Sequence, residues 1–125
     1  MQKGASGMAT LKEIIDLVDK DKVNGYTSEE KTQWISNVEM QIAREVFGTD
    51  VPEYDWETDQ ETELLLGAPF EDIYELYVMA QIDFHQGEYN RYNNELSQFN
   101  TRLQDAQAWH IREHRPPRQY FRWFV

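Results

Sequence analysis

Residues 69–114 read PFEDIYELYVMAQIDFHQGEYNRYNNELSQFNTRLQDAQAWHIREH and hold the two longest helical patterns in the chain. After Gly87, apolar residues recur at intervals of three and four, which keeps them on one face of a helix. This seam consists of Tyr89, Tyr92, Leu96, Phe99, Leu103 and Ala106. Before Gly87, apolar residues cover more than one face, so we expect that helix in the middle of the structure. Because Gly87 suits a left-handed turn, the pattern predicts a long central αα-hairpin.

Two shorter helices are expected before this hairpin. Two threonines are each followed three residues later by a glutamate, which is the capping-box pattern of a helix N-terminus. The pairs are Thr10 with Glu13 and Thr27 with Glu30. The first helix should cover about residues 11–20, and Gly48 should end the second. The predicted fold class is therefore all-α, a small helical domain of about four helices.

An acidic loop is expected between the second helix and the hairpin. The segment between residues 48 and 68 has no basic residue and ends on the three leucines 64–66. Its carboxylates include Asp50, Glu53, Asp55, Glu57, Asp59 and Glu61. We expect a solvated loop that the leucines anchor to the core. A calcium site and contact with a basic partner are alternatives.

No catalytic or metal-binding constellation stands out in the sequence. An EF-hand starting at Asp55 would have acidic residues at its first three ligand positions, but Gln60 and Leu66 replace the required Gly and Glu. His110 and His114 share a helix face, yet the HExxH pattern is missing. We therefore expect no enzyme activity, no metal and no cofactor. The tyrosines at helical spacing are more typical of a core or of a subunit interface, for which Tyr77, Tyr89 and Tyr92 are the candidates.

The chain of 125 residues is long enough for one domain. We divide it into residues 1–9 (an N-terminal arm or an artificial extension), the helical domain 10–114, and an extended C-terminal arm, 115–125. The net charge of −11 is uneven. Residues 1–109 hold 8 Lys and Arg against 22 Asp and Glu, whereas the remaining residues hold four Arg and one Glu. The body should therefore repel nucleic acid. The chain has no cysteine and no apolar run that could span a membrane.

The C-terminal arm differs in character from the rest of the chain. It cannot continue a helix through its two consecutive prolines. We predict that it binds a partner through Arg115, Pro116, Pro117, Arg118, Tyr120, Phe121, Arg122, Trp123, Phe124 and Val125. Tyr, Trp and Arg are the usual hot-spot residues of interfaces, and leaving these aromatic rings in water is unfavourable. Folding back onto its own domain is the alternative.

The sequence resembles a family of phage structural proteins. The relevant runs are TELLLGAPFEDIYELYVMAQIDF (62–84), GEYNRYNN (87–94), Phe99-Asn100 and LKEIIDLVD (11–19). They are similar to the head–tail connector (adaptor, or head-completion) proteins of tailed bacteriophages and prophages. The resemblance covers about residues 10–110.

The resemblance implies a structural role in the neck of the virion, after assembly in the host cytoplasm. The subunits would form a ring, dodecameric like the portal, that docks on the portal protein through the C-terminal arm. The ring would extend the DNA channel to a downstream neck (stopper) or tail-completion protein, which the acidic loop could face. DNA would pass through without specific binding, and no membrane would be involved.

A second function remains open from the residues alone. Small acidic phage proteins rich in tyrosine can mimic DNA and inhibit a host nucleic-acid-binding protein. The acidic loop would then be the working surface, and the C-terminal arm would only complete the core. Such an inhibitor should keep its activity when residues 115–125 are removed.

Overall fold

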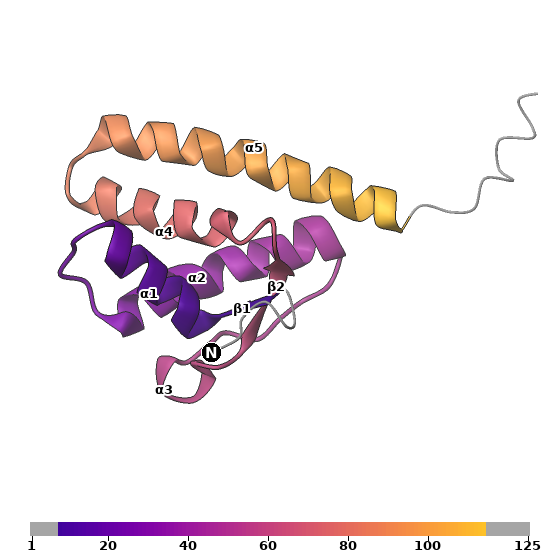
Figure 1. Cartoon of the computed structure of the whole chain (residues 1–125), viewed down its shortest axis with the longest axis horizontal. Coiled ribbons are helices and arrows are strands. Elements are labelled where there is room, and N and C mark those ends of the chain that lie inside the picture. The colour runs from indigo at the N-terminus through magenta and orange to yellow at the C-terminus, as the bar shows by residue number, and fades with distance from the viewer. Residues whose placement is uncertain (1–7, 115–125) are drawn as a thin grey trace, which may run out of the picture.

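The computed structural model describes residues 8–114, which form a mostly helical domain with one small two-stranded sheet (Figure 1). In chain order the elements are β1 (Met8–Thr10), α1 (Leu11–Asp21), α2 (Ser28–Ile42), the π-helical turn η2 (Ala43–Phe47), α3 (Trp56–Asp59), β2 (Glu63–Gly67), α4 (Asp72–His85) and α5 (Tyr89–Glu113). The prediction of a small helical domain is confirmed. The sheet was not predicted. Among the described residues, no helix is long and apolar enough to cross a membrane.

Both predicted capping boxes are present and fix where α1 and α2 begin. Thr10 Oγ1 accepts from the backbone N–H of Glu13 at 3.2 Å, and Glu13 Oε1 accepts from the N–H of Thr10 at 2.9 Å. The same reciprocal pair joins Thr27 and Glu30, at 3.1 and 2.8 Å. Each box satisfies two N–H groups that a helix terminus leaves without intrahelical acceptors.

Two glycines provide the left-handed backbone that ends two helical segments. Gly48 has a φ of 67° after η2, and Gly87 has a φ of 79° between α4 and α5. After Gly87 the chain reverses, so α5 runs back antiparallel along α4 (Figure 1). Both glycine predictions are confirmed.

The segment predicted as a plain acidic loop contains the short helix α3 and the strand β2. This strand pairs antiparallel with β1, with Met8 opposite Gly67 and Thr10 opposite Glu63. The expected anchoring by leucine is confirmed, because Leu64 and Leu66 are buried. Side chains alternate along a strand, so three consecutive leucines place two in the core and leave the third partly exposed. Pairing also brings Met8 and the buried Ala9 into the folded domain.

Helix α4 lies in the middle of the domain, as its apolar residues on several faces predict. It packs against α5 on one side and against α1 and α2 on the other (Figure 1). Its residues Ile73, Tyr74, Val78 and Ile82 are fully buried. The hydrophobic core is therefore built around α4.

A fully buried carboxyl group, that of Glu39 in α2, ties three elements together. Its Oε1 accepts from the Tyr74 hydroxyl of α4 at 2.6 Å. Its Oε2 accepts from the Tyr54 hydroxyl at 2.9 Å and from the backbone N–H of Leu65 in β2 at 2.8 Å. Burial raises the pKa of Glu39, while these three hydrogen bonds oppose that rise. The Tyr74 hydroxyl also accepts from the N–H of Leu66 at 2.9 Å, so β2 is held by side chains as well as by β1.

Candidate functional site

All ten residues predicted to bind a partner through the C-terminal arm lie outside the described residues. The structure shows the helix that leads to them. The last buried residue of α5 is Ala106, and the helix continues to Glu113. Ile111 is 63% exposed, and residues 112–114 are exposed too. The last residues of helix α5, from Ile111 to Glu113, thus extend beyond the core.

The predicted acidic loop forms a charged exterior. Asp50, Glu53, Asp55, Glu57 and Glu61 are exposed, and Asp59 is half-buried. Two of these carboxylates serve the local backbone, because Asp55 Oδ1 accepts from the N–H of Glu57 and Asp59 Oδ2 accepts from the N–H of Asp55. Within residues 8–114, no group of three or more His, Asp or Glu side chains is close enough to hold a metal ion.

The three tyrosines predicted at a subunit interface have different surroundings. Tyr77 is half-buried and packs on Phe99, with ring centroids 5.4 Å apart. Tyr89, the first residue of the predicted seam, is 58% exposed, so α4 covers this end of the seam only in part. Tyr92 is half-buried, and both Tyr89 and Tyr92 contact Phe84, at 5.8 and 5.1 Å. The seam becomes buried only from Phe99 onward, because the first turns of α5 lie beside the exposed end of α4.

Tyr89 and Tyr92 belong to a larger aromatic patch at the end of the domain where α4 meets α5. We define the aromatic patch as Tyr26, Trp34, Phe84, His85, Tyr89 and Tyr92. Each ring contacts at least one other, at centroid distances of 5.1–6.2 Å. Among the described residues, four large hydrophobic side chains are exposed, and Phe84 and Tyr89 are two of them. Exposed rings gathered in this way are characteristic of interaction sites.

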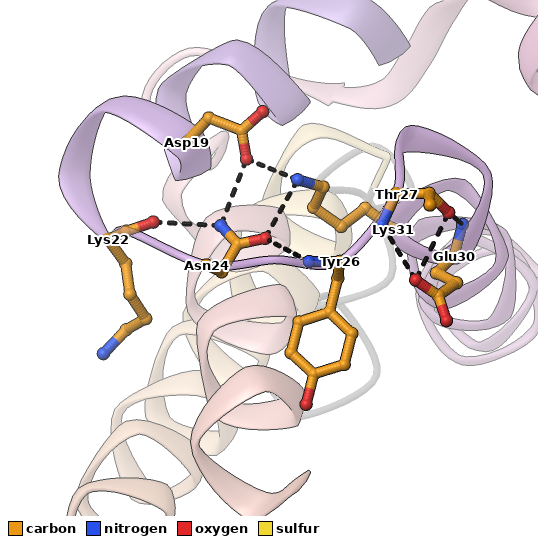
Figure 2. Close-up of polar contacts among 7 residues, drawn as sticks. All are labelled: Asp19, Lys22, Asn24, Tyr26, Thr27, Glu30 and Lys31. Carbon is orange, nitrogen blue, oxygen red and sulfur yellow. Dashed lines mark hydrogen bonds and ion pairs between the residues drawn. The ribbon is translucent and has the colours of Figure 1, made fainter. Parts of the chain in front are cut away.

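A polar network in the α1–α2 loop holds Tyr26 in the patch (Figure 2). Asn24 is its centre: Nδ2 donates to Asp19 Oδ1 and to the backbone oxygen of Lys22, at 3.2 and 2.9 Å. Its Oδ1 accepts from the N–H of Tyr26 and from Lys31 Nζ, each at 3.1 Å. Lys31 is only 3% exposed and also pairs with Asp19. The loop is therefore fixed before any partner arrives, which lowers the entropy cost of binding.

A shallow pocket of about 500 Å³ opens within the patch. It is lined by Tyr26, Glu30, Gln33, Trp34 and His85. The His85 ring stacks on Trp34, with centroids 5.6 Å apart and planes 16° apart, and Tyr26 meets Trp34 edge-to-face. Aromatic rings and a carboxylate that line the same pocket suit a guanidinium group or another aromatic ring.

A buried charge cluster fastens the same loop to α4 and α5. Lys22 Nζ contacts both carboxylate oxygens of Asp83 at 3.0 Å and lies 3.8 Å from Glu95 Oε2. The Asp83 side chain is fully buried. Burial, followed by the adjacent Asp83 carboxyl, raises the pKa of Glu95 to about 7. One lysine thus faces two carboxyl groups that sit within hydrogen-bonding reach of each other.

This cluster predicts a pH dependence of stability. An acid whose pKa is higher in the folded than in the unfolded state stabilises the fold at low pH, and that contribution is lost as pH rises from about 4.5 to about 7. The Glu95→Gln variant keeps a neutral hydrogen-bond donor toward Asp83. We expect it to be more stable than the wild type at pH 7.5 by about 1 kcal/mol, because solvent screening reduces the full linkage effect, and no more stable at pH 4.5.

Thermal unfolding at several pH values measures this difference. The matched control is Glu57→Gln, which neutralises an exposed carboxylate on α3. A Glu95→Gln variant whose stability differs from the wild type by the same amount at every pH would contradict the prediction.

The aromatic patch and the charge cluster were not predicted from the sequence. Trp34 and Phe84 read as ordinary members of apolar helix faces, and the prediction had no means of placing the α1–α2 loop beside the α4–α5 turn. One signal was available: Phe84 and His85 stand directly before the turn at Gly87, where few neighbours can cover them. Comparison with models of protein families, with curated proteins and with solved structures finds no match to this chain.

Proposed function

We propose that this protein is a ring-forming adaptor of the phage neck, which docks on the portal protein through residues 115–125 and extends the DNA channel toward the next neck or tail-completion protein. The observation that carries the proposal is the course of α5. Beyond Ala106, Trp109 and His110 still pack on Phe70 and Phe47, but the last residues of the helix are exposed, with Ile111 at 63%. A basic and aromatic sequence that follows an exposed helix end is suited to insertion into a partner.

Two further features support the adaptor role. The exposed carboxylates of the acidic loop give a surface that repels DNA, as the wall of a DNA channel requires. A ring needs two different contact faces on each subunit, since its interfaces are heterologous. The aromatic patch and the helical end that bears the arm lie at opposite ends of α5 (Figure 1), so they are distinct candidates for such faces.

Co-purification with a portal protein tests the proposal. The full chain is compared with a version that ends at His114, which keeps every buried residue of the described core. We expect the full chain to bind and the shortened chain to lose binding while keeping its helical circular-dichroism signal. Binding by both would move the portal contact to the helices, and binding by neither would contradict the adaptor proposal.

The DNA-mimic alternative is favoured by one observation, the row of exposed carboxylates from Asp50 to Glu61. Under this proposal the acidic loop competes with DNA for a host protein. Removing residues 115–125 should then leave inhibition intact. Replacing Glu53 and Glu57 by lysine should abolish inhibition, whereas those two changes should not affect portal binding by an adaptor.

A further inference from the structure

We infer that the aromatic patch of one copy binds the C-terminal arm (residues 115–125) of a second copy. This contact goes beyond the proposed portal docking, because it concerns the protein by itself. The arm would then bind another copy in the absence of the portal protein. The aromatic patch and the portal would compete for the same arm.

The reach of the arm argues against binding to the patch of its own copy. Helix α5 has 25 residues and is therefore about 37 Å long, with Tyr89 of the patch at its start and the arm at its end. Tyr120 is six residues beyond His114, so it can reach about 20 Å, and Trp123 about 30 Å. Even a fully extended arm would leave most of its aromatic residues short of the patch. A second copy has no such constraint.

The chemistry of the two surfaces is complementary. The arm holds three arginines, four aromatic residues and no Asp or Glu. The patch offers exposed rings, of which Phe84 is 45% and Tyr89 58% exposed, and a pocket lined by Glu30 as well as by Trp34. Stacking of aromatic rings and of guanidinium groups on them suits this pairing. In Figure 2 only one oxygen of Glu30 is engaged in the capping box, which leaves the other for a cation.

Such a contact joins one end of a subunit to the opposite end of the next. The interface is heterologous, so a pair of copies still has one free arm and one free patch between them. Repetition of the contact closes a ring if the rotation between copies allows it, and otherwise produces a filament. A subunit that carries both halves of the contact therefore assembles in a manner that depends on concentration.

Sedimentation velocity of the full chain over a range of concentrations tests the inference, with no portal present. We expect association by the wild type. The double variant Phe84→Ala/Tyr89→Ala, which lacks an intact patch, and the chain ending at His114, which lacks the arm, should each stay monomeric. Phe84 is 45% and Tyr89 58% exposed, and neither belongs to the buried core, so the fold should persist, and circular dichroism checks this.

Mixing the two defective proteins provides the decisive measurement. One keeps an arm and the other keeps a patch, so together they should form a 1:1 complex, although neither associates alone. Glu30→Gln in the patch-bearing protein should weaken this complex about tenfold and reduce its dependence on salt. Glu57→Gln, an equal change of charge on α3, should leave it unchanged. A wild type that is monomeric at every concentration, or a mixture that forms no complex, would overturn the inference without bearing on portal binding.

Discussion

Replacing Glu39 by alanine is expected to lower the free energy of unfolding by about 3–5 kcal/mol. The change leaves three donors without their acceptor: the hydroxyl groups of Tyr54 and Tyr74 and the backbone N–H of Leu65. A buried donor that loses its partner costs about 1–3 kcal/mol, and the removed side chain also leaves a cavity. For a domain of this size the unfolding midpoint should fall by at least about 12 °C.

Three further variants separate the loss of the Glu39 hydrogen bonds from the general effect of replacing a glutamate in a helix. Tyr54→Phe removes one hydrogen bond and should cost about 1 kcal/mol. Glu39→Gln retains the size of the side chain but turns an amide N–H₂ toward donors. Its cost should therefore lie between those of Tyr54→Phe and Glu39→Ala. Glu57→Ala, which removes an exposed carboxylate, should change stability by less than about 0.5 kcal/mol. A Glu39→Ala variant that unfolds like Glu57→Ala would contradict the assignment.

The parts of the fold that the sequence predicted are those with local causes. The capping boxes at Thr10 and Thr27 join residues three positions apart, and Gly48 and Gly87 act through their own backbone angles. The pairing of β1 with β2 escaped prediction because its two strands lie more than fifty residues apart in the chain, and each is short. The burial of Glu39 was not predicted either, since it depends on hydroxyl groups supplied by other elements.

In the candidate site, too, the features with local causes were predicted and those made by distant parts of the chain were not. Composition alone separated the basic, aromatic arm from the acidic body, and the exposure of the acidic loop follows from its charge density. The aromatic patch could not be predicted, because it is assembled from the α1–α2 loop, α2, the end of α4 and the start of α5. Spacing within one helix shows which face is apolar, but not where the neighbouring helices stop covering it.

Replacing Lys22 by methionine is expected to cost about 3–5 kcal/mol at pH 7.5. Lys22 is the ion-pair partner of the buried Asp83, and its removal leaves that carboxylate without a counter-charge beside Glu95. The cost should be smaller at pH 5.5, where Glu95, with its pKa of about 7, is mostly protonated and can donate a hydrogen bond to Asp83. Urea unfolding of the variant and the wild type at both pH values measures this difference.

A double-mutant cycle shows whether the cost comes from the charge left behind. Adding Asp83→Asn to Lys22→Met removes the uncompensated carboxylate, so the double variant should be more stable than Lys22→Met at pH 7.5. The control is Lys12→Met, which breaks the pair of Lys12 with Asp16, also 3.0 Å long but exposed on both sides. It should leave the unfolding midpoint nearly unchanged, because water replaces an exposed partner. If Lys12→Met and Lys22→Met had equal effects, or if Asp83→Asn gave no recovery, the burial of Asp83 would not be what makes this ion pair important for stability.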